Sequence, residues 1–132
     1  MRNIILMGLL SFCLLGCAPF RNLDMQDVRV AKNKIGDGAI PYALADINNF
    51  IEKYNYNCNV TAKLTFDGDN KKLASYIIYG MGLTQANPYF IVDFKDNQDG
   101  TTEYTGYAIY PYSKHALDEL LGVIERKGAC KK

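Results

Sequence analysis

The first sixteen residues decide how much of this 132-residue chain is left to fold. A basic start at Arg2 is followed by an apolar run from Ile4 to Leu15, which only one glycine and one serine interrupt. A helix that crosses the hydrocarbon of a bilayer needs about 20 apolar residues, and this run has about a dozen. A short basic start before such a run is typical of a secretory signal peptide. The run therefore predicts a segment that directs export and is then removed.

The apolar run ends in Leu14-Leu15-Gly16-Cys17, which resembles the lipobox of bacterial lipoprotein precursors at all four positions. The resemblance implies that residues 1–16 are a lipoprotein signal peptide. It also implies that the Cys17 thiolate accepts a diacylglyceryl group and becomes the first residue of the mature protein. A membrane is then the first expected partner, because each buried lipid methylene contributes about 0.8 kcal/mol to binding.

The residue after the lipidated cysteine bears on localisation. Lipoproteins of this family with Ala18, rather than an aspartate, at that place are sorted to the outer membrane. The resemblance therefore implies an outer-membrane lipoprotein that faces the periplasm or the cell surface.

Removal of 16 residues from 132 leaves 116, which is enough for one small domain. Residues 17–40 mix charged side chains and glycines with few large apolar groups. We therefore interpret 17–40 as the lipidated cysteine and a tether. Residues 41–132 are expected to form a single small α+β domain.

The charge balance argues against a nucleic-acid partner. Without Arg2, the mature chain has 14 basic and 14 acidic side chains, so its formal net charge is zero. Binding to phosphates needs clustered Lys and Arg that release counterions. We expect no nucleic-acid partner. The nearest basic group, at the end of the chain, is explained by placement near a helix C-terminus and consists of Arg126, Lys127, Lys131 and Lys132.

Cys58 and Cys130 are expected to form a disulfide. Cys13 leaves with the signal peptide and Cys17 carries the lipid, which leaves this pair in an oxidising compartment. A redox or metal role is the alternative. The chain has no C-x-x-C and only one histidine, His115, whereas a zinc site needs about four nitrogen or sulfur ligands. No metal or other cofactor is expected.

Apolar spacing predicts helices at the two ends of the domain. After Pro41, apolar side chains recur at helical intervals and predict a helix over residues 41–55. The last helix is expected between an N-cap at Ser113 and a C-cap at Gly128. Its apolar stripe has the i, i+3, i+4, i+7 spacing and consists of Leu117, Leu120, Leu121 and Ile124.

The segments between the helices favour strands. Strict alternation from Cys58 to Phe66 predicts a half-buried strand. Residues 71–83 fit either a capped helix or a strand, and we prefer the strand. Together these elements predict a two-layer α+β fold, with an antiparallel sheet of about three to four strands and two helices on one face.

Residues 89–110 predict a hairpin with its loop at 97–101. A shift of one residue would place Phe94 opposite a glutamate, so we prefer the register that sets apolar against apolar residues. That register pairs Phe94 with Tyr104, Val92 with Gly106 and Phe90 with Ala108.

Ten tyrosines and no tryptophan give the chain its one unusual compositional feature. Packing in the core and sheet explains most of them, since aromatic residues favour strands. Tyrosine also suits binding, because it offers a large area, few rotatable bonds and a hydroxyl. An exposed face with Tyr79, Tyr89 and Tyr107 is our candidate surface for an envelope protein or a glycan.

The sequence does not favour an enzyme. The closest nucleophile and base are Ser113 and His115, and the serine is explained as an N-cap. We expect a lipid-anchored envelope lipoprotein whose disulfide-linked domain binds a macromolecular partner, in assembly of an envelope complex or at the surface. Two alternatives remain open. One is an inhibitor of a lysozyme-like hydrolase, and the other is a binder of a small apolar ligand between the helices and the sheet.

Overall fold

The structure, a computed structural model, describes residues 22–82 and 84–131, so the lipobox and Cys17 lie outside the described residues. Antiparallel strands in this part of the chain form one five-stranded sheet with the order β1-β5-β4-β3-β2. The strands are β1 (Lys34–Ile40), β2 (Leu64–Asp67), β3 (Asn70–Met81), β4 (Ala86–Asp96) and β5 (Thr102–Ala108).

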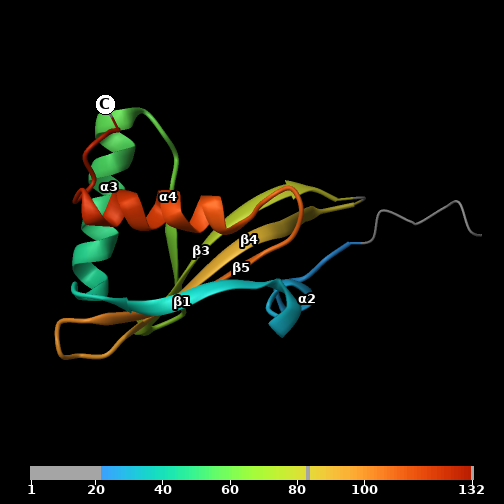
Figure 1. Cartoon of the computed structure of the whole chain (residues 1–132), viewed down its shortest axis with the longest axis horizontal. Coiled ribbons are helices and arrows are strands. Elements are labelled where there is room, and N and C mark those ends of the chain that lie inside the picture. Colours follow the sequence, from blue (N-terminus) through green and yellow to red (C-terminus); the bar gives the residue numbers. More distant parts are fainter. Residues whose placement is uncertain (1–21, 83, 132) are drawn as a thin grey trace, which may run out of the picture.

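The helices cover the two faces of the sheet unequally. Helices α3 (Leu44–Cys58) and α4 (Lys114–Glu125) lie on one face, and the short α2 (Met25–Val28) lies on the other (Figure 1). A 3-10 turn, η1 (Ala31–Asn33), joins α2 to β1. We call the two faces the helix face and the α2 face. The predicted α+β class with an antiparallel sheet is confirmed, but the sheet has five strands instead of three to four.

The additional strand comes from the segment that we interpreted as a tether. Strand β1 pairs with β5 along its length, and its last residue, Ile40, is buried. The tether interpretation is therefore wrong for residues 34–40. A Cβ at Gly36 would lie 2.9 Å from Leu117 Cδ2 of α4, so that side chain would have to shift. Gly36, one of the glycines that suggested a linker, instead leaves room for Leu117 of α4 at the edge of the sheet.

Helix α3 begins and ends three residues later than the predicted range of 41–55. At its start the N-cap residue Ala43 makes no side-chain hydrogen bond, and the Leu44 N–H donates to Asp96 Oδ2 of β4 at 3.3 Å. At its end, Asn59 takes the left-handed conformation with φ of 53°, which is a common way for a helix to stop. A distant carboxylate therefore caps the helix start.

The strand predicted from Cys58 to Phe66 is mostly helix end and loop, because β2 begins only at Leu64. The Asn55 side chain accepts a hydrogen bond from the Ala62 N–H at 2.8 Å and donates one to the Ala62 carbonyl. This pairing satisfies the backbone groups that a longer strand would have offered to its neighbour.

The predictions for the second half of the domain are confirmed, except that the C-cap of α4 is Arg126 and not the predicted Gly128. Residues 71–83 were expected to form a strand, and β3 occupies most of that range. Strands β4 and β5 pair in the predicted register, and Ser113 caps α4 by accepting from the His115 N–H. The observed pairs are Phe94 with Tyr104, Val92 with Gly106 and Phe90 with Ala108.

The core lies between the helix face and helices α3 and α4. Alternate residues of β4, namely Phe90, Val92 and Phe94, point to this face and are buried. The helical side chains against them follow the predicted apolar stripes and are Leu44, Ile47, Ile51, Leu117, Leu120 and Ile124.

The predicted disulfide joins Cys58, at the end of α3, to Cys130, which follows α4, with 5.6 Å between their Cα atoms. Residues after α4 turn back along α3. Gly128 packs closely against the Phe50 carbonyl, and the Lys127 ammonium lies 5.8 Å from the centre of the Tyr42 ring. The disulfide therefore fastens a segment that already contacts α3.

Candidate interaction surface

The α2 face has its own fixed structure. Arg29, which follows α2, binds both carboxylate oxygens of Asp93 on β4, at 2.8 Å through Nε and 2.7 Å through Nη2. The Ser75 hydroxyl of β3 donates to Asp93 Oδ1 at 2.6 Å and accepts from Arg29 Nη2 at 3.2 Å. This two-point arginine–carboxylate geometry is strongly directional. It holds the N-terminal segment against the middle of the sheet.

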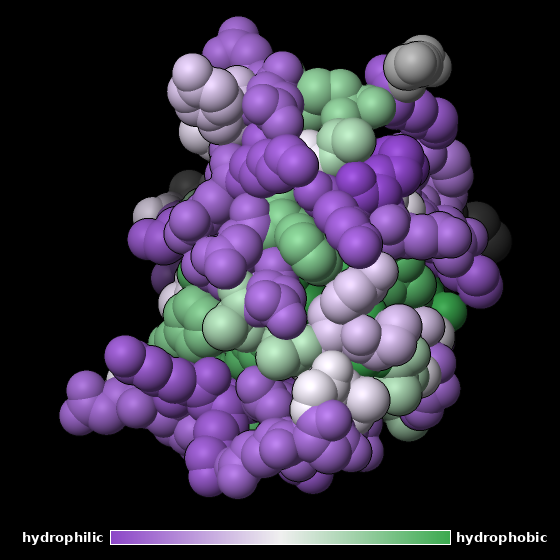
Figure 2. All heavy atoms as spheres, turned by 90° about the vertical axis from the view of Figure 1, so that its left-hand side faces the viewer, coloured by the Kyte–Doolittle hydropathy of each residue, from purple (hydrophilic) through white to green (hydrophobic). Residues whose placement is uncertain are grey.

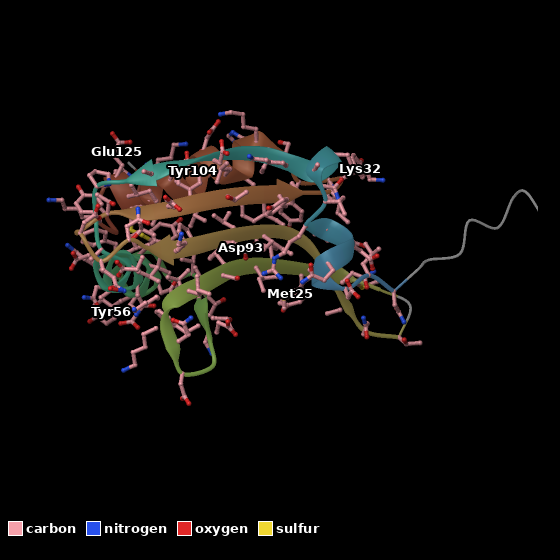
Figure 3. The ribbon with its side chains drawn as sticks, turned by 90° about the horizontal axis from the view of Figure 1, so that it is seen from below. Met25, Lys32, Tyr56, Asp93, Tyr104 and Glu125 are labelled. Atoms are coloured by element: carbon pink, nitrogen blue, oxygen red, sulfur yellow. A yellow bond between two sulfur atoms is a disulfide. The ribbon has the colours of Figure 1, made fainter. Side chains whose placement is uncertain are left out.

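Helix α2 supplies an apolar contact beside this ion pair. Val28 is fully buried. Ile91 is also fully buried, and it lies between Tyr89 and Asp93 among the β4 side chains that point to the α2 face. Asp24 is the N-cap of α2. Its side chain accepts a hydrogen bond from the Asp27 N–H, and the Asp27 side chain accepts one from the Asp24 N–H. Figure 3, seen from below, shows α2 lying across the sheet with Met25 near its β3 side. Part of the α2 face is therefore covered by residues that we had expected to be a tether.

A groove of about 490 Å³ lies between α2 and strands β2 and β3. Its apolar lining includes the half-buried side chains of Met25, Leu73 and Ile77. Arg29 and Asp93 also line it, so an ion pair lies beside the apolar surface. The groove is thus a mixed polar and apolar concavity of the size at which ligands bind.

The structure does not bring the three predicted tyrosines together. Tyr89 and Tyr107 both lie on the α2 face, each half-buried. The register of β3 and β4 shifts between Ile78 and Tyr79, where Tyr89 of β4 has no partner on β3. A Cβ on Gly80 would meet the Tyr89 ring at 2.3 Å, so Gly80 faces Tyr89 and its neighbour Tyr79 points to the opposite face. Tyr79, which is half exposed, therefore does not share a surface with the other two.

Tyr89 has a local structural contact. Its ring lies against Gly80, and its hydroxyl donates to the Met81 carbonyl at 2.9 Å. These contacts hold the end of β3 beside β4. Tyr89 is therefore explained at least in part as a residue that fixes the β3–β4 turn, and its binding role stays a prediction.

A second, smaller cavity of about 190 Å³ lies between the helices and the sheet. Its lining includes Tyr54, Tyr76 and Leu120. Burial raises the pKa of Tyr76, with smaller contributions from Tyr54 and Tyr112, so the Tyr76 hydroxyl stays protonated at neutral pH. Ligand sites usually have about 300 Å³ or more. The cavity is therefore small for the apolar ligand that we considered.

Sequence analysis missed Arg29, Ser75 and Asp93 as a group. Arg29 and Asp93 are 64 residues apart, and neither belongs to a motif. The signal available was the paired register of β3 and β4, which sets Ser75 opposite Asp93. It could place those two side chains together but could not indicate an arginine from outside the predicted domain.

A search of family models and of curated proteins finds no match to this chain. In the part of the chain that the structure describes, no helix is long and apolar enough to cross a membrane. The same part contains no cluster of three or more His, Cys, Asp or Glu residues with the geometry of a metal site.

Proposed function

We propose that this chain is a lipid-anchored envelope protein, attached through Cys17, whose disulfide-linked domain binds a protein partner. The lipobox at Leu14-Leu15-Gly16-Cys17 supports the anchor. An outer-membrane location follows from the same resemblance and from Ala18. The groove on the α2 face carries the partner-binding part of the proposal.

The groove supports a protein partner because it combines two kinds of contact. Met25, Leu73 and Ile77 offer an apolar area that water covers only in part. The Arg29–Asp93 pair is also partly accessible, with side-chain exposures of 23% and 33%. Aromatic and apolar anchors surrounded by polar groups are typical of protein interfaces.

Replacement of the predicted lipidation site tests the anchor. We expect Cys17→Ser to abolish diacylglyceryl transfer, because serine has no thiolate. The variant should then leave the detergent-soluble membrane fraction, and intact mass spectrometry should show no lipid. Ala18→Ser is the matched control, because it changes a neighbouring residue and keeps the thiol. Lipid still present on Cys17→Ser would contradict the assignment.

A charge in the groove tests the partner site. We expect Ile77→Arg to lower the yield of a photo-crosslinked partner about tenfold, equal to about 1.4 kcal/mol of binding, because it places a cation among apolar contacts. The crosslinker is placed at Thr65, an exposed residue of the groove rim, and the experiment uses intact membranes.

Val60→Arg is the control for this charge. Val60 is 38% exposed in the loop after α3 and lies outside the groove lining. It should leave the crosslinked product unchanged. Equal loss in both variants, or recovery of the bait alone from wild-type membranes, would contradict a partner at the groove.

A further inference from the structure

The first described residues of the chain lie at one end of the sheet. Asn22 Nδ2 donates to Thr84 Oγ1 at 2.5 Å, and the Thr84 N–H donates to Asn22 Oδ1 at 3.2 Å. The Leu23 N–H donates to the buried Asn87 Oδ1 at 2.9 Å. Thr84 lies between β3 and β4, and Asn87 is near the start of β4. The N-terminal segment is therefore held at the β3–β4 turn, at the right-hand end in Figure 1.

Exposed apolar side chains gather at the same end. Met81, the last residue of β3, is 89% exposed, and Tyr79 is 51% exposed. Tyr110 is 93% exposed and follows β5 at the same level, because its neighbour Ile109 donates to the Tyr89 carbonyl. Among the described residues, five large apolar side chains are exposed, and these are three of them. Single exposed apolar residues are ordinary, but several at one end indicate a contact.

The length of chain between the anchor and this end is short. Cys17 and Asn22 are five residues apart, and five extended residues span at most about 18 Å. A domain of about 100 residues has a radius of gyration of about 13 Å. The distance from the lipid to the β3–β4 turn is thus shorter than the domain is wide. An anchored domain would have this end as its nearest point to the bilayer.

The opposite end of the molecule has a different surface. Figure 2 looks at that end, where hydrophilic residues cover most of the view and hydrophobic residues show between them. It holds the Cys58–Cys130 disulfide and one strongly exposed aromatic residue, Tyr56, which lies away from α2 and Lys32 in Figure 3. Tyr56 therefore serves as a control site, because it is an exposed aromatic residue far from the β3–β4 turn.

From these positions we infer that Tyr79, Met81 and Tyr110 rest in the interfacial region of the bilayer that holds the lipid of Cys17. The inference depends on the proposed anchor. Tyrosine suits this region because its ring is apolar and its hydroxyl remains hydrated, and methionine adds a flexible apolar chain. The bilayer is the expected contact of these side chains, because the short segment between Cys17 and Asn22 keeps this end of the domain within reach of it. The groove on the α2 face then stays open to a protein partner.

Fluorescent probes on the full-length lipidated chain test this contact. Met81→Cys and Tyr110→Cys are labelled with an environment-sensitive fluorophore in membrane vesicles, and Tyr56→Cys is the matched control. We expect blue-shifted emission at the first two sites. Lipids with a nitroxide near the headgroup should reduce their emission about twofold and leave the Tyr56 probe nearly unchanged, because only an interfacial probe meets the nitroxide.

The outcomes separate the contact from the anchor. Intact mass spectrometry first shows whether Cys17 carries the lipid, and its absence would overturn the anchor and this inference together. With the lipid present, water-like emission at both Met81 and Tyr110 would overturn the contact alone. Blue-shifted emission without nitroxide quenching would assign this end to a protein or a second copy of the chain, and would also overturn it. All three labelled sites are strongly exposed, and two independent test sites guard against a local folding defect.

Discussion

Replacement of both Cys58 and Cys130 by serine is expected to lower the free energy of unfolding by about 4 kcal/mol. The disulfide closes a loop with a sequence separation of 72 residues, and its loss increases the conformational entropy of the unfolded chain. This is a large fraction of the stability of a small domain, which is typically about 5–15 kcal/mol. Urea unfolding of a fragment spanning residues 22–132 measures the change.

The wild-type fragment under reducing conditions provides the control. Reduction should lower the stability by nearly the same amount as the double substitution, because both remove the same covalent link. Serine in place of each sulfur changes little else, since Cys130 is exposed and Cys58 is half-buried. A loss below about 1 kcal/mol would show that the contacts of residues 126–131 with α3 fix this segment without the link.

The elements that could be predicted have local signals that agree with their packing. Helix α4 has a capping serine and an apolar stripe within one short segment. The β4–β5 register is fixed by the apolar residues of a single hairpin, because a shift of one residue would turn them to the wrong face. In both cases the nearest residues in the sequence are also the neighbours that decide the structure.

Strand β1 could not be predicted in this way. Its Gly36 and Gly38 weaken any strand pattern, and their role depends on distant side chains. A Cβ at Gly36 would press on Leu117, and one at Gly38 would lie 2.9 Å from the Tyr104 hydroxyl. At these two positions Leu117 of α4 and Tyr104 of β5 occupy the space that a side chain on β1 would need. These contacts join residues that are far apart in the sequence, so no local pattern could predict them.

The placement of the three predicted tyrosines also depends on contacts that are distant in the sequence. Period-two alternation assigns Tyr79 to the same face as Ile77, which lies opposite Ile91. The register shift after Ile78, where β4 has one residue more than β3, breaks this alternation. The candidate groove also depends on Arg29, which pairs with a residue 64 positions away, so neither surface has a local signal.

Substitution of Gly128 by alanine is expected to lower the free energy of unfolding by about 3 kcal/mol. Gly128 has φ of 77°, which strains any residue with a side chain. Its Cβ would also lie 2.2 Å from the Phe50 carbonyl oxygen and 3.1 Å from Lys53 Cβ, so the segment that carries Cys130 would have to move away from α3. Urea unfolding of the same 22–132 fragment measures the loss.

Gly100→Ala separates the two causes. Gly100 has a similar φ of 87°, but a Cβ there would meet nothing within 4 Å. It therefore retains the conformational strain and lacks the steric contact, and we expect a loss of only about 1 kcal/mol. The difference between the variants measures how tightly the last residues pack on α3. Equal losses would contradict that packing, and the disulfide alone would then hold the end of the chain. A larger loss for Gly128→Ala that persists after reduction would assign the difference to noncovalent contact with Phe50.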